Sequence, residues 1–185
     1  MTPSTAFLQG DRVFLRAPEP GDIPMITRLE NHPDPRYTLF YALPTSQQQQ
    51  LDKTNRQTQD PNTILFTICR NDTLEPVGQT AFVRIDWVGR MGTFYLGIAD
   101  KANWSTGIGS ETTRLMVHYA FQTLNFNRVE LKVAAENTAA YRVYEKTGFR
   151  LEGTLRQAMF HEGRYCDFHV MGILREEFNQ LGKTL

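Results

Sequence analysis

The chain has 185 residues, of which 41% are hydrophobic and 22% charged, a composition that excludes a disordered protein and fits a folded one. This length predicts a single domain over residues 1–185. Twenty Lys and Arg residues balance twenty Asp and Glu residues, and the net charge of zero argues against a nucleic-acid partner or a membrane-binding surface. No apolar run is long enough to span a bilayer and no secretory signal is recognisable, so a cytoplasmic protein is expected.

The cysteines and histidines lack the spacing of a metal site or of a nucleophile. Cys69 and Cys166 lie far apart, and neither is followed by a partner at metal-ligand spacing. The run from His161 to Tyr165 lacks the second histidine of a zinc-binding helix. We therefore expect no metal ion and no catalytic cysteine.

The first half of the chain predicts one strand and two helices, followed by three strands. Asp22 opens the first helix and Pro24 lies in its first turn, whereas Ser46 caps a second helix within a segment free of Gly and Pro. Short β-rich runs separated by turn residues then indicate strands in hairpin succession. The ranges are a strand at 11–16, helices at 21–30 and within 45–60, and strands at 63–69, 77–86 and 93–98.

The second half changes to a helical period. Apolar residues recur at spacings of three and four from Ile108 to Ala120, and Gly148 follows a second helical segment at 137–146. A strand is predicted at 128–133 between them. Beyond Phe149, two strands flank the turn Glu162–Gly163, and the second places four apolar residues on one face: Cys166, Phe168, Val170 and Leu174. This order of elements predicts an α+β fold with a mixed sheet.

A glycine-containing loop joins a strand to a helix at Trp104-Ser-Thr-Gly-Ile-Gly-Ser-Glu111. Glycines allow close backbone approach, and a helix start offers free N–H groups, so the loop is suited to a phosphate. A dinucleotide-binding fingerprint would need a third glycine at Thr112, and a P-loop would need lysine at Ser110. An ordinary strand-to-helix turn remains the alternative.

The helix at 137–146 carries a second polar pattern. At 3.6 residues per turn, Asn137, Tyr141 and Tyr144 lie on one face. Asn137 is either only a helix cap or also a ligand contact, and Tyr144 is either a core aromatic or a functional phenol.

Together the two segments resemble the GNAT superfamily of acetyl-CoA-dependent N-acetyltransferases. The family's Gln/Arg-x-x-Gly-x-Gly/Ala motif is matched from Trp104 to Gly109, with Trp in the first position. Its later motif is matched at the positions Asn137, Ala140, Tyr144, Gly148 and Phe149. The Trp and the closing runs at 152–156 and 163–167 look like the ribosomal-protein N-terminal acetyltransferase branch and the related spermidine acetyltransferases. The resemblance covers residues 75–175.

This resemblance implies a mixed, mostly antiparallel sheet flanked by helices, with acetyl-CoA as cosubstrate. The strand at 93–99 is expected to splay from 128–133, the loop N–H groups to hold the CoA pyrophosphate, and the pantetheine arm to pair with backbone near 96–99. A backbone N–H around Ile98 or Ala99 would then face the thioester oxygen. The expected cofactor-binding residues are Leu96, Ile98, Ala99, Trp104, Ser105, Thr106, Gly107, Ile108, Gly109, Ser110, Asn137 and Tyr144.

Tyr144 is the expected catalytic general acid, because a phenol with a pKa of about 10 is protonated at neutral pH and can donate to a departing thiolate. The general base is open. Family members often carry an acidic residue on the central strand, whereas this chain has Thr93-Phe94-Tyr95 there. Tyr95, Glu136 or a water molecule on backbone carbonyls remain as alternatives.

The acceptor is expected to be a primary amine, with a peptide or protein N-terminal amine favoured because its pKa of about 8 lessens the need for a base. Residues 1–60 hold seven acidic and six basic residues, which is no acidic surplus for a polycation. Tyr37, Phe40 and Tyr41 either line an acceptor pocket or pack onto the core. The alternatives are a polyamine or small-metabolite acetyltransferase and a non-catalytic acyl-CoA-binding module. Homodimers are common among the relatives, so a homodimer is a further expectation.

Overall fold

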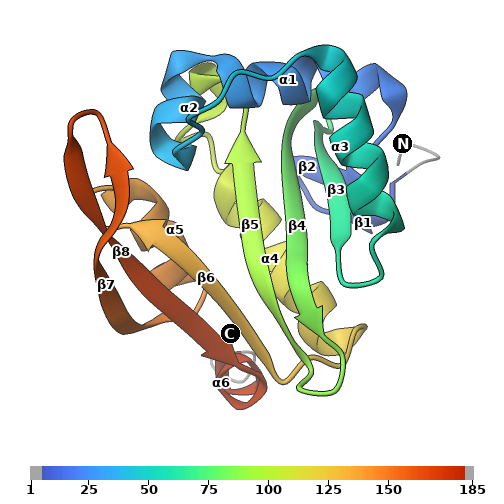
Figure 1. Ribbon diagram of the computed structural model, residues 1–185. Coiled ribbons are helices and arrows are strands. Elements are labelled where there is room, and N and C mark those ends of the chain that lie inside the picture. Colours follow the sequence, from blue (N-terminus) through green and yellow to red (C-terminus); the bar gives the residue numbers. More distant parts are fainter. Residues whose placement is uncertain (1–5, 182–185) are drawn as a thin grey trace.

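The computed structural model describes residues 6–181, in which one eight-stranded sheet has the order β1-β2-β3-β4-β5-β6-β8-β7 (Figure 1). All neighbouring strands are antiparallel except β5 and β6, which are parallel. The fold is therefore the expected α+β arrangement with a mixed, mostly antiparallel sheet. The strands are β1 (Leu8–Gln9), β2 (Val13–Arg16), β3 (Ile64–Arg70), β4 (Pro76–Asp86), β5 (Met91–Ile98), β6 (Arg128–Ala134), β7 (Arg150–His161) and β8 (Arg164–Leu174).

Helices cover both faces of the sheet. The larger buried cluster lies under α4 and α5, and a smaller cluster lies between α1 and the opposite face. Figure 1 shows α3 in front of the sheet and α4 behind it. No helix within residues 6–181 is both long and apolar enough to cross a membrane. The α-helices are α1 (Ile23–Asn31), α2 (Pro33–Leu39), α3 (Gln47–Gln59), α4 (Ile108–Gln122), α5 (Thr138–Lys146) and α6 (Arg175–Leu181).

Local signals account for the helix starts. Ser46 caps α3 as predicted, since its hydroxyl accepts from the N–H of Gln49 while the Gln49 side chain accepts from the N–H of Ser46. Asp22 precedes α1, but its carboxylate is buried against Arg16 and Thr67 and does not cap the helix. Asp22 therefore joins the start of α1 to two strands.

Three short elements were not predicted, namely β1, α2 and α6. The four apolar residues predicted to share one face of β8 differ in burial, because Cys166 is buried and Phe168 and Val170 are half-buried. Met171 and Ile173 are fully buried, whereas Leu174 is 39% exposed. The physical reason is cross-strand pairing, because Met171 lies opposite Leu131 and Ile173 opposite Val129, both core residues of β6.

The parallel pair β5–β6 is short, and this opens the sheet in the middle. The two strands pair only from Met91 with Arg128 to Thr93 with Glu130. Beyond this point β5 stays paired with β4 and β6 with β8, so each strand keeps one neighbour. Figure 1 shows the two strands diverging upward from their paired ends. The expected splay of the strand at 93–99 from the strand at 128–133 is confirmed.

Candidate active site

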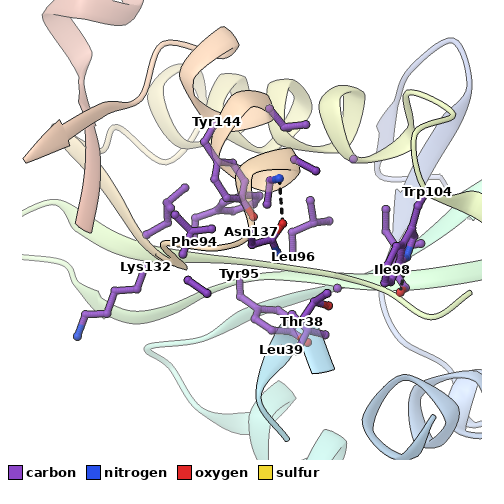
Figure 2. Close-up of a pocket in the computed structure, with 18 of the residues that line it drawn as sticks. Thr38, Leu39, Phe94, Tyr95, Leu96, Ile98, Trp104, Lys132, Asn137 and Tyr144 are labelled. Atoms are coloured by element: carbon purple, nitrogen blue, oxygen red, sulfur yellow. Dashed lines mark hydrogen bonds between the residues drawn. The ribbon is translucent and has the colours of Figure 1, made fainter. Parts of the chain in front are cut away.

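A cavity of about 420 Å³ occupies the opening between β5 and β6 (Figure 2). Residues from both strands line it, together with the start of α4, one face of α5 and the end of α2. Of the expected cofactor-binding residues, the lining includes Leu96, Ile98, Trp104, Ser105, Gly107, Gly109, Ser110, Asn137 and Tyr144. Two segments that are distant in sequence, the glycine loop and α5, therefore meet at one cavity.

The other three expected residues do not line the cavity. Ala99 is buried in the cluster beside α1. Ile108 is buried in the core below the loop. The hydroxyl of Thr106 donates to the carbonyl of Asn103 within the loop.

The edge of β5 that faces the cavity carries the backbone groups of alternate residues. Ala99 donates its N–H to the carbonyl of Val77 on β4. Because successive residues of a strand direct their backbone groups to opposite sides, Leu96 and Ile98 direct theirs toward the opening. The Ile98 carbonyl accepts from Nε1 of Trp104 at 3.3 Å. Of the two expected donors, Ile98 therefore faces the cavity and Ala99 faces away from it.

Helix α4 begins at the cavity without a side-chain cap. Its N-cap, Gly107, has a φ of 92°, a conformation that L side chains rarely adopt. The first bond of the helix runs from the Glu111 N–H to the Gly107 carbonyl, so the N–H groups of residues 108–110 have no partner inside the helix. A helix start of this kind attracts an anion.

Asn137 and Tyr144 project into the cavity from α5. The Asn137 side-chain oxygen caps the helix by accepting from the Ala140 N–H at 3.1 Å, which leaves the amide NH2 group for a ligand (Figure 2). The Tyr144 ring is 8% exposed and makes edge contacts with Phe94 and Phe149. Burial raises the pKa of Tyr144 to about 12, so the phenol remains protonated across the physiological range.

A tyrosine pair forms part of the cavity wall that faces α2. Tyr95 lines the cavity, and its hydroxyl lies 2.8 Å from the hydroxyl of Tyr41. Burial raises the pKa of Tyr41 to about 12 and the pKa of Tyr95 well above its ordinary value. Both phenols are therefore protonated at neutral pH and are poor proton acceptors.

Aromatic contacts close this side of the cavity. Phe40 follows α2 and lies 5.0 Å from Phe168 and 4.5 Å from His161, measured between ring centroids. Tyr37 lies 4.7 Å from the same imidazole. Of the three aromatic residues expected near the acceptor, Phe40 lines the cavity and Tyr41 reaches it through Tyr95.

Charged side chains are scarce around the cavity. Among the described residues that line it, Lys132 is the only charged one, and Figure 2 shows its ammonium directed away from the labelled cluster. Glu136 does not line the cavity, and its carboxylate accepts from both terminal guanidinium nitrogens of Arg164, which lowers the Glu136 pKa. Glu136 is therefore a weaker base than a free carboxylate.

Sequence reasoning missed the lining residues that belong to no motif. Thr38 and Leu39 come from α2, whose proline-containing sequence carries no helical period. Phe168 lies on β8, and the segment 131–134 lies on β6. Alternating apolar residues marked these strands but did not indicate which side chains would face the cavity.

Comparison with known proteins identifies the family. A model described as the acetyltransferase (GNAT) domain matches residues 12–150. The uncharacterised N-acetyltransferase p20 of Bacillus licheniformis is 34% identical over 61% of this chain and 63% of its own length. The spermidine N(1)-acetyltransferase of Vibrio cholerae is 27% identical over 90% of this chain and 95% of its own. The match with p20 thus spans less than two thirds of the length of that relative.

Solved structures show the same fold. The spermidine N-acetyltransferase of Vibrio cholerae in complex with CoA and spermine superposes with a TM-score of 0.85 and 26% identity, covering 92% of this chain and 99% of that one. The splayed strands, the uncapped start of α4 and the Asn137–Tyr144 face have the arrangement that the two motifs led us to expect. This chain belongs to the GNAT acetyltransferase family.

Proposed function

We propose that this protein transfers the acetyl group of acetyl-CoA to a primary amine in a ternary complex, and that the acceptor is the α-amino group of a peptide or protein. The observation that carries the proposal is the cavity between β5 and β6, which has the free N–H groups of α4 at one end and the protonated Tyr144 on its wall. These groups match the two demands of the reaction, an anion site and a proton donor.

The cosubstrate fits the residues present. The pyrophosphate is held by the N–H groups at the start of α4, and the pantetheine arm lies along β5 as an added strand that pairs with Leu96 and Ile98. The amide NH2 group of Asn137 is a further donor to this arm. The thioester oxygen then faces the N–H of Ile98.

The chemical step is direct attack. The amine lone pair forms the C–N bond, and the carbonyl oxygen gains negative charge that the Ile98 N–H stabilises. The C–S bond then breaks, and the thiolate takes a proton from the Tyr144 hydroxyl. The amine nitrogen loses a proton, which returns through water to the oxygen of Tyr144. The products are therefore an amide and the CoA thiol.

The lack of a base favours an α-amino acceptor. No carboxylate lines the described cavity, and the Tyr41–Tyr95 pair is protonated. The amine must therefore arrive neutral. At pH 7 about one α-amino group in ten is neutral, against fewer than about one in a thousand for an amine of the lysine type.

A polyamine is the second candidate acceptor, and similarity to spermidine acetyltransferases favours it. Two ammonium groups need carboxylates to bind, and the acidic residues near α2 are paired, Glu30 with Lys53 and Asp34 with Lys101. A ribosomal-protein acceptor remains a prediction. A homodimer also remains a prediction, and light scattering during size-exclusion chromatography measures the oligomeric state.

Acetyl-CoA-dependent release of thiol, measured over a panel of amines, tests the proposal. The panel contains peptides with a free N-terminus, and the same peptides with a blocked N-terminus and an internal lysine. It also contains spermidine and single amino acids. Turnover only with free N-termini is expected, and kcat/KM rises with pH up to the acceptor's pKa. Turnover with spermidine alone would transfer the assignment to a polyamine. If no amine reacts although acetyl-CoA raises the melting temperature, the protein is an acyl-CoA-binding module.

A further inference from the structure

The turn between β1 and β2 is fixed to the start of α4. The Glu111 carboxylate accepts from the N–H of Asp11 at 2.6 Å and from the N–H of Arg12 at 2.9 Å. From the other side, the Asn71 amide donates to the carbonyls of Gly10 and Asp11, and the Asn71 N–H donates to the Arg12 carbonyl. The backbone of Arg12 is therefore held from both sides.

The side chain of Arg12 lies against the N-cap of α4. Its Nε is 3.2 Å and its Cζ 3.7 Å from the position that a Cβ on Gly107 would occupy. Arg12 is an exposed residue, and within residues 6–181 its guanidinium has no carboxylate or carbonyl partner. Both oxygens of Glu111 are already engaged by backbone N–H groups.

This position is unfavourable for a cation without an anion nearby. The start of a helix carries a partial positive charge, and a guanidinium placed there is repelled by it. Glu111 supplies one negative charge in the same turn, whereas a pyrophosphate carries about two, which both the helix start and the guanidinium can bind. The backbone contacts of Glu111 thus hold a cation beside the N-cap of α4.

We propose that Arg12 binds the pyrophosphate of acetyl-CoA, together with the N–H groups of α4, and that Glu111 positions it by holding its backbone. This rests on the proposed function, in which acetyl-CoA lies in the cavity between β5 and β6. Arg12 belongs neither to the glycine-loop motif at 104–109 nor to the motif that begins at Asn137, and it lies near the N-terminus of the chain.

Binding of CoA and of pantetheine, which lacks the pyrophosphate, tests the proposal. Both are titrated against the wild type, Arg12→Ala and Arg12→Gln, with the change in tryptophan fluorescence as signal, because Trp104 lies in the cavity wall. The loss of one charge-assisted contact predicts an increase of about tenfold or more in the Kd for CoA in each variant. The Kd for pantetheine stays unchanged, and the effect on CoA shrinks as salt is added.

Arg56→Ala is the matched control, because Arg56 is exposed on α3, which covers the opposite face of the sheet. It leaves both Kd values at the wild-type level. An unchanged Kd for CoA in the Arg12 variants would overturn the proposal, and so would an equal loss for CoA and pantetheine, which indicates a distorted cavity. If the wild type binds neither ligand, the proposed function itself fails, whatever Arg12 does.

Discussion

The two ends of the cavity are built from different chemical groups. At the end that we propose for the cosubstrate, most of the binding groups belong to the backbone, namely the N–H groups of residues 108–110 and the free edge of β5 at Leu96 and Ile98, and the side chains of Asn137 and Arg12 add to them. At the end that we propose for the acceptor, the lining groups are side chains from elements distant in sequence, such as Phe40 and Phe168. Backbone groups can hold the same cosubstrate while many side chains change, whereas an acceptor pocket made of side chains can change its specificity by substitution.

Replacement of Tyr144 by Phe tests the proposed proton donor, which lies between the two ends of the cavity, and it has the largest expected effect. Loss of the proton donor lowers kcat about a hundredfold, whereas the Kd for CoA changes little because the ring remains. Since its pKa is about 12, the wild-type kcat shows no fall from Tyr144 below pH 10. Stopped-flow kinetics and CoA titration measure both. An equal loss of rate and affinity would contradict the role of general acid.

A change at Gly109 tests the cosubstrate end. A Cβ there would meet only Ile98 and Leu96 side chains at 3.6 Å, an ordinary contact, so Gly109→Ala is compatible with the fold. The methyl group narrows the cavity beside the free N–H groups, and we expect the Kd for CoA to rise about tenfold, the value of one charge-assisted hydrogen bond. Gly21→Ala, where a Cβ meets nothing within 4 Å, is the control. Unchanged CoA affinity with an intact melting temperature would show that the pyrophosphate lies elsewhere.

Truncation of Phe40 tests the acceptor end separately. Phe40→Ala removes aromatic contacts with Phe168 and His161, and the acceptor KM rises about fivefold, as expected for roughly 1 kcal/mol of lost apolar contact. The KM for acetyl-CoA stays constant. Phe160→Ala is a suitable control, because Phe160 is 60% exposed near the end of β7. If both KM values rise together, the two ends are not independent.

The smallest effect is expected at Tyr95. Tyr95→Phe removes the 2.8 Å hydrogen bond to Tyr41, and the free energy of unfolding falls by about 1 kcal/mol. Because the raised pKa keeps this phenol protonated, it does not act as a base, and kcat falls less than about threefold. Denaturant unfolding and steady-state kinetics measure the two quantities. A large loss of kcat that disappears at high pH would instead identify Tyr95 as the base.

The difference between the two ends also explains what the sequence alone could predict. The glycine loop and the Asn137–Tyr144 face have fixed spacings because backbone geometry sets them, so their meeting at one cavity was foreseeable. The direction of the Ala99 N–H depends on the register with Val77, which no motif encodes. Phe168 and Leu39 reach the cavity through tertiary packing, and the pairing of the Glu136 carboxylate depends on Arg164 at the start of β8. Contacts of this kind are set by the fold and leave no local pattern.

The short contact between β5 and β6 has a consequence for the dynamics of the molecule. Only three residue pairs of the ladder join strands β1–β5 to strands β6–β8, so beyond these pairs the two halves of the sheet are held together by the shared buried cluster under α4 and not by backbone hydrogen bonds. A cosubstrate lying along β5 and touching α5 binds both halves and couples their opening. In the proposed complex we expect the amide hydrogens of Leu96 and Ile98 to exchange with solvent more slowly than in the free protein, because the cosubstrate would take the place of a neighbouring strand.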